Sequence, residues 1–191
     1  DLEAAHRFAE RTRPQMGGRH AGTVATRPAV RTRRLWYAWA MRAVITQGSH
    51  TTLATTDLPD PTPGPGELLV RVTACGVCGS DLHLSDALDV PGIVLGHEFA
   101  AEVLEAGPGV EGWSGGERIA AFPIVSCGTC AWCAAGSPSK CAQANQLGLG
   151  RPGAFAQLTT MAADGAYRLP ASLGDDLGAL VEPLAVAHHA L

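Results

Sequence analysis

Four of the chain's six cysteines lie within fifteen residues, in the stretch CGTCAWCAAGSPSKC. Their spacing is C-x2-C-x2-C-x7-C, through Cys127, Cys130, Cys133 and Cys141. Thiolates this close together, on a loop that contains glycines, can converge tetrahedrally on a zinc ion. An iron–sulfur cluster is an alternative, although in that motif the fourth cysteine follows sooner and precedes a proline. Disulfides are disfavoured because nothing marks the chain as secreted.

Four thiolates would leave a bound zinc ion with a net charge of −2 and no open coordination position. An ion in such a site is a weak Lewis acid and has no room for a substrate. The charge of the cysteine cluster therefore predicts a structural role rather than a catalytic one.

A second set of metal ligands lies upstream, in ACGVCGSDLHLSDALDVPGIVLGHEFA. Cys78, His97 and Glu98 offer a thiolate, an imidazole and a carboxylate, each a competent zinc ligand. One thiolate and one carboxylate would neutralise the ion, which would keep its acidity and could hold a water or an alcohol. Each residue alone has an ordinary alternative, since a single cysteine after a strand is commonly a small core residue.

The net charge of −4 is unevenly distributed along the 191 residues. Residues 1–40 hold eight arginines and three acidic residues, a net +5, and the remaining six basic and fifteen acidic residues give −9. The first forty residues contain no serine and no periodic pattern, which indicates a disordered or non-native extension, with a targeting or nucleic-acid arm as the alternative. The acidic remainder argues against nucleic-acid binding. No apolar run approaches the ~20 residues of a membrane span, so we expect a cytoplasmic protein without membrane contact.

Short strands with turn signals between them are predicted downstream of Met41. Turn-forming proline and glycine residues concentrate in LPDPTPGPGE. The alternating or β-rich segments are residues 41–48, 67–78, 92–107, 116–123 and 153–163. Such a pattern is typical of a small barrel or sandwich.

The segment after Pro170, SLGDDLGALVEPLAVAHHAL, is predicted to form one or two helices. Ser172 is the expected N-cap, and Asp175 and Asp176 suit a first turn. A G-x-G-x-x-G match at residues 148–153, GLGRPG, is rejected as a dinucleotide site, because it contains a proline and precedes a strand-like segment rather than a helix.

The motifs GVCGSDLH, GHEFA, GERIA, the four-cysteine loop and EPLAVAHHAL occur in one order. In this order and spacing they resemble the zinc-containing medium-chain alcohol dehydrogenase family, which includes alcohol, sorbitol, threonine and butanediol dehydrogenases. The resemblance extends from about Met41 to Leu191. It implies a mainly β fold, with a GroES-like β-barrel catalytic domain and zinc-binding lobe over residues 41–170. It also implies that residues 171–191 are the helical start of a dinucleotide-binding α/β domain that is otherwise absent.

The resemblance also implies roles for individual residues. Cys78 and His97 would hold a catalytic zinc, with Glu98 as a ligand or alternate ligand. Glu182 stands where the family places a further ligand, and which glutamate binds at rest is left open. The four cysteines would hold a second, structural zinc. Ser80 and His83 would form a proton relay, whereas Cys75, His188 and His189 are not expected to be ligands.

The implied activity is NAD- or NADP-dependent oxidation of a small alcohol or polyol, in which zinc activates the hydroxyl for hydride transfer. No cofactor-binding residue is expected in this chain, so it should bind two zinc ions but have little dehydrogenase activity alone. The full-length form could be a homo-oligomer. The alternative function is a non-enzymatic, zinc-binding GroES-like interaction module.

Overall fold

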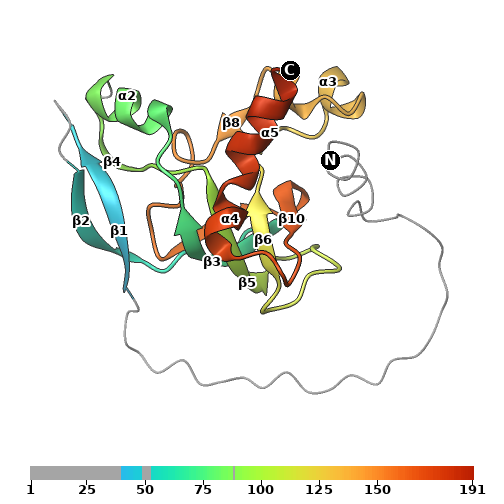
Figure 1. The fold of residues 1–191 in the computed structure, drawn as a ribbon, viewed down its shortest axis with the longest axis horizontal. Helices are drawn as coiled ribbons and strands as arrows, with labels where there is room; N and C mark the ends of the chain where they lie inside the picture. Colours follow the sequence, from blue (N-terminus) through green and yellow to red (C-terminus); the bar gives the residue numbers. More distant parts are fainter. Residues whose placement is uncertain (1–39, 49–52, 88) are drawn as a thin grey trace. The chain divides into compact units, whose positions relative to one another are not determined.

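The computed structural model describes residues 40–48, 53–87 and 89–191 (Figure 1). The expected Arg-rich extension, residues 1–40, lies outside the described residues except for Ala40, which begins the first strand. The described residues belong to a single structural unit, residues 39–191.

Antiparallel strands form the body of this unit, as Figure 1 shows. The largest sheet has the strand order β10-β6-β5-β3-β9, and a second sheet has the order β2-β1-β4. A short pair, β7 with β8, brackets the cysteine loop in the sequence. The strand bounds are β1 Ala40–Gln47, β2 Leu53–Pro59, β3 Glu67–Cys75, β4 Pro91–Val94, β5 Phe99–Ala106, β6 Arg118–Ala121, β7 Ile124–Val125, β8 Asn145–Gln146, β9 Leu158–Ala162 and β10 Ala166–Arg168.

The two larger sheets are linked where β1 runs beside the segment that precedes β9. Ala43 and Ala156 form an isolated bridge, and the Gln157 N–H donates to the Arg42 carbonyl at 3.0 Å. The predicted β-rich architecture is therefore confirmed. Among the described residues the strands form separate, bridged sheets rather than one continuous hydrogen-bonded barrel.

Alternation along β3 directs its apolar side chains into the core. Leu68 and Val70 are fully buried, whereas Arg71 is exposed, because successive side chains of a strand lie on opposite faces. The same cluster collects buried side chains from β5, β6, β9 and the loop before β9: Phe99, Ala101, Val103, Ile119, Ala121, Leu147, Ala154 and Met161. Leu147 and Ala154 flank the GLGRPG segment, so the core anchors both ends of that loop.

The β-rich segment predicted at residues 92–107 contains two strands in the structure. β4 ends at Val94 and β5 begins at Phe99, and the two strands belong to different sheets. Between them Gly96 has a φ of +91°, a conformation that residues with a Cβ rarely adopt. The chain passes from one sheet to the other through residues 95–98, the segment that carries His97 and Glu98.

Short helices connect the strands. Helix α2 (Gly79–Ala87) follows β3 and was not predicted from the sequence. The cysteine loop contains α3 (Ala131–Ala134) and the 3-10 helix η1 (Pro138–Lys140), and a second 3-10 helix, η2 (Ala163–Gly165), precedes β10. No helix among these residues is long and apolar enough to cross a membrane.

The predicted C-terminal helices are present as α4 (Asp175–Ala179) and α5 (Val181–His189). The prediction of Ser172 as N-cap was wrong, because the Leu173 N–H closes a turn onto the Pro170 carbonyl and Gly174 becomes the N-cap. Arg118 on β6 donates to the Leu173 carbonyl at 2.6 Å and to the Asp175 carboxylate at 2.9 Å. These bonds fix the start of α4 against the large sheet.

We expect Leu68→Ala to lower the free energy of unfolding by about 2–5 kcal/mol, because it removes a fully buried side chain and leaves a cavity. Leu53 on β2 is 46% exposed, and Leu53→Ala is the control, with an expected loss under about 1 kcal/mol. Urea unfolding followed by circular dichroism measures both. Equal losses in the two variants would contradict this placement of the core.

Candidate metal centres

Cys78 and His97 are brought together by the antiparallel pairing of β3 with β5. The end of the register joins Cys75 to Phe99. Just beyond this pair, the Gly76 N–H donates to the Glu98 carbonyl at 2.7 Å. The segment that follows β3 therefore runs beside the segment that precedes β5.

The ligand atoms of Cys78, His97 and Glu98 lie within 4.8 Å of one another. His97 is buried, and the other two residues are half-buried. Thiolate and carboxylate together balance the two positive charges of zinc, and three protein ligands leave a fourth position for water or substrate. The donor set therefore fits a zinc site of the catalytic type.

Asp81, which the sequence analysis did not single out, supports this group from α2. Its carboxylate is 3% exposed and accepts the N–H of Cys78 at 2.9 Å and the N–H of Gly96 at 3.3 Å. One carboxylate oxygen also lies 3.5 Å from Nδ1 of His97. A carboxylate beside Nδ1 favours the proton on that nitrogen and leaves the Nε2 lone pair free for a metal. The sequence feature that marks this residue is its position three residues after Cys78, inside GVCGSDLH.

The two expected relay residues, Ser80 and His83, both lie on α2. The Ser80 hydroxyl lies 3.5 Å from Nε2 of His97, beside the ligand group. His83 is exposed on the same helix. The structure therefore places one relay residue at the ligands and the other at the solvent.

Glu182 lies in the first turn of α5, outside the group formed by Cys78, His97 and Glu98. Burial raises the pKa of its carboxyl, the charge of His97 opposes that rise, and the charge of Glu98 adds to it. Glu182 is therefore within electrostatic reach of the site, while Glu98 is the carboxylate that lies among the ligand atoms.

Cys75 lies outside the group formed by Cys78, His97 and Glu98. Its Sγ donates to the Gly76 carbonyl at 3.4 Å, and its side chain packs against the core. Burial, together with the charges of Asp81 and Glu98, raises the pKa of Cys75 to about 12. The group therefore remains a neutral thiol.

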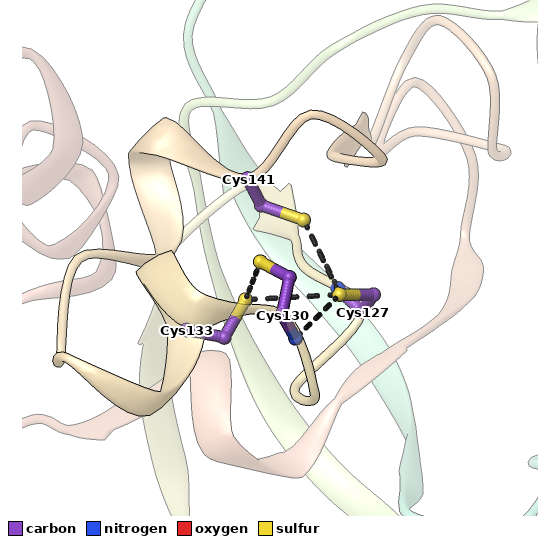
Figure 2. A group of neighbouring side chains, drawn as sticks. All are labelled: Cys127, Cys130, Cys133 and Cys141. Carbon is purple, nitrogen blue, oxygen red and sulfur yellow. Dashed lines mark hydrogen bonds between the residues drawn. The ribbon is translucent and has the colours of Figure 1, made fainter.

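Cys127, Cys130, Cys133 and Cys141 form the second group of ligand atoms among the described residues (Figure 2). The sulfur–sulfur distances are 3.4 Å for Cys130–Cys133, 3.5 Å for Cys127–Cys141 and 3.9 Å for Cys127–Cys133. These exceed the roughly 2.05 Å of a disulfide bond. Four sulfurs at tetrahedral corners, about 2.3 Å from a zinc ion, would be about 3.8 Å apart. The observed cluster fits that arrangement.

Hydrogen-bond donors surround the Cys127 sulfur. Backbone hydrogen bonds from Thr129 and then Cys130 are the main reasons why the pKa of Cys127 falls to about 6. The Cys130 N–H lies 3.4 Å from this sulfur, and the Thr129 hydroxyl lies 3.7 Å from it. The loop therefore stabilises a thiolate, the form that binds metals.

Comparison with known proteins identifies a family that this sequence matches. The sequence matches the model of the alcohol dehydrogenase GroES-like domain over residues 64–171. Sorbitol dehydrogenase of Halalkalibacterium halodurans is 36% identical over 156 residues, which make up 79% of this chain and 45% of that protein.

Solved structures of dehydrogenases share the fold. Galactitol-1-phosphate dehydrogenase from Escherichia coli superposes with a TM-score of 0.73 at 30% identity, over 78% of this chain and 44% of that one. An alcohol dehydrogenase from Escherichia coli complexed with NADH superposes with a TM-score of 0.72 at 33% identity, over 78% and 44%.

The chain spans about half the length of the relatives it matches. These relatives are dehydrogenases, and the mainly β, GroES-like fold expected from the sequence is confirmed. Because the family model covers more than half of its residues, the chain belongs to the alcohol dehydrogenase GroES-like domain family.

Proposed function

We propose that this chain is the zinc-binding, alcohol-activating part of an NAD(P)-dependent alcohol or polyol dehydrogenase. The convergence of Cys78, His97 and Glu98 carries the proposal, because these ligands balance the charge of zinc and leave one position open. When bound there, zinc supplies the Lewis acidity that lowers the pKa of an alcohol hydroxyl.

Residues of α2 would perform the proton-handling steps. Asp81 orients the His97 imidazole through Nδ1. The Ser80 hydroxyl, beside Nε2 of His97, takes the proton of the alcohol and passes it to His83. His83 is exposed, so its imidazole can release the proton to water.

The four-cysteine cluster would hold a second zinc ion with a structural role. Four thiolates leave no open position and give the ion a net charge of −2, which weakens its Lewis acidity. The contribution of this ion is to cross-link the loop between β7 and β8.

Alcohol oxidation also needs a nicotinamide that accepts the hydride. A related Escherichia coli structure contains NADH, and we extend a requirement for NAD or NADP to this protein. The sheets of the described residues are antiparallel and include no doubly wound sheet of the kind that holds such a cofactor. We therefore propose that the chain alone binds zinc and oxidises alcohols slowly or not at all.

Metal analysis tests the proposal, with an expected content of about two zinc ions per chain. Cys78→Ser should lose one ion and keep its fold, because the pairing of β3 with β5 holds this part of the backbone without the metal. Cys130→Ala should lose the other ion and melt at a lower temperature. In a second measurement, cobalt replaces zinc and an alcohol analogue is added. The analogue should change the visible spectrum of cobalt in wild type and in Cys130→Ala, which both keep the Cys78 site. It should not change the spectrum of Cys78→Ser.

Two results would contradict this division of roles. A single tightly held zinc that Cys78→Ser retains would favour the non-enzymatic zinc-binding module. Loss of analogue binding in Cys130→Ala, with both metals and the fold intact, would place the chemistry at the cysteine cluster instead.

Asp81→Asn should weaken zinc binding at the Cys78 site by about 10–100-fold, because the amide lacks the charge that holds His97 in the ligating form. Competition with a chromogenic chelator measures this affinity. Asp164 is an exposed carboxylate on η2, and Asp164→Asn is the matched control with no expected change. An unchanged affinity in Asp81→Asn would remove Asp81 from the site.

Substitution of the two glutamates tests which carboxylate binds the metal. Glu98 lies among the ligand atoms and Glu182 does not, so Glu98→Gln should weaken zinc binding at least about tenfold more than Glu182→Gln. The same chelator competition measures both variants. The opposite order would identify Glu182 as the resting ligand.

A further inference from the structure

The GLGRPG segment, residues 148–153, has the glycine spacing of a dinucleotide-binding turn but a different structure. Leu147 and Arg151 form an isolated bridge, and the Gly148 N–H donates to the Arg151 carbonyl at 2.9 Å. The strand β9 follows the segment, whereas a phosphate-binding turn opens onto a helix N-terminus. The glycines of this segment are therefore needed for a purpose other than phosphate binding.

This loop pairs with the segment that leads to His97. The three N–H groups of residues 153–155 donate to the three carbonyls of residues 94–96, at 2.8–2.9 Å. The Phe155 carbonyl in turn accepts the Val44 N–H at 2.7 Å. The segment directly before His97 is therefore held between the loop and the rest of the fold.

The absence of a side chain at Gly153 permits this pairing. A Cβ at Gly153 would overlap the carbonyl oxygens of Leu95 and Gly96, which are backbone atoms that cannot rotate away. Across the contact, a Cβ at Gly96 would lie 2.6 Å from the Phe155 ring. The two chain segments, residues 94–96 and 153–155, approach each other more closely than residues with side chains allow.

Gly96 connects this contact to the candidate zinc site. Its carbonyl accepts the Ala154 N–H, and its own N–H donates to the Asp81 carboxylate at 3.3 Å. The same carboxylate oxygen lies 3.5 Å from Nδ1 of His97, and the second oxygen accepts the Cys78 N–H. A shift of Gly96 would therefore change the surroundings of the imidazole and of the thiolate together.

We propose that residues 148–155 are a positioning loop for the Cys78 zinc site. By fixing the backbone of residues 94–96, the loop sets the orientation of the His97 imidazole and thereby the metal affinity of that site. Gly153 is the positioning residue, and its N–H donates to the Val94 carbonyl rather than to one of the three metal ligands. The inference rests on the proposed zinc-binding function, so its test includes one measurement that needs no metal.

Gly153→Ala in the full chain is the test. We expect the zinc affinity of the Cys78 site, measured by competition with a chromogenic chelator, to fall at least about tenfold relative to wild type. The affinity of the four-cysteine cluster should match wild type. In the metal-free chain, the imidazole 15N chemical shifts of His97 should move away from those of the wild-type Nδ1–H tautomer.

Gly150→Ala provides the matched control in the same loop. The three atoms nearest to a Cβ at Gly150 all belong to the side chain of Asn145, which is exposed and can rotate. Both measurements should therefore match wild type. If Gly153→Ala does not fold, Phe155→Leu reduces the packing on Gly96 without a backbone clash, and the His97 shifts should move in the same direction.

Wild-type zinc affinity and wild-type His97 shifts in Gly153→Ala, or in Phe155→Leu where that variant replaces it, would overturn the positioning role. Equal effects in Gly150→Ala and Gly153→Ala would also overturn it, because they would indicate a general loosening of the loop. Zinc in the cysteine cluster alone, already in wild type, would overturn the proposed function instead. The His97 shifts of the metal-free chains would then decide the positioning role by themselves.

Discussion

The ladder between β3 and β5 determines where the metal-binding side chains lie. Its register joins Cys75 to Phe99 and directs Leu68 and Val70 into the core. Because the side chains of a strand alternate, a slip by one residue would expose those core residues and displace Cys78 from His97. Burial of apolar surface therefore selects the same register that assembles the candidate site.

The two metal-ligating groups depend on the fold to different degrees. The four cysteines belong to one loop, and nearby groups of that loop, at Thr129 and Cys130, stabilise the Cys127 thiolate. The other group draws Cys78 from the segment after β3 and His97 from the link between two sheets, and the buried Asp81 contacts both. The geometry of this group thus depends on tertiary structure. Ligands that are fixed by the fold can hold three coordination positions of a zinc ion while the fourth stays open.

Features that depend on neighbouring residues could be predicted from the sequence, whereas features that depend on tertiary contacts could not. The cysteine spacing and the alternation along residues 67–78 are local signals. The structure brings the four cysteines together and contains a strand over Glu67–Cys75. Residues 92–107 were predicted as a β-rich segment, and the structure contains β4 and β5 there. The break between these strands was not predicted, because the positive φ of Gly96 and the change of sheet depend on tertiary contacts.

Three further features depend on tertiary contacts in the same way. Helix α2 was not predicted because GSDLHLSDA has no apolar stripe of helical period, so its position follows from its contacts rather than its pattern. The role of Asp81 depends on burial beside Cys78 and His97, which an acid in a polar sequence does not reveal. Similarly, Ser172 is a good N-cap residue by type, but the turn onto Pro170 moves the helix start to Gly174.

The GLGRPG segment shows why glycine spacing does not identify a ligand. A glycine indicates only that the backbone adopts a positive φ, as at Gly148, or approaches another group closely, as at Gly153. In a dinucleotide fold that group is a pyrophosphate, and the following helix offers unpaired N–H groups to it. Here the close neighbours are the carbonyls of Leu95 and Gly96, and the following strand β9 pairs with β3. The N–H groups of residues 153–155 already have carbonyl partners, so the same pattern serves to dock one chain segment against another.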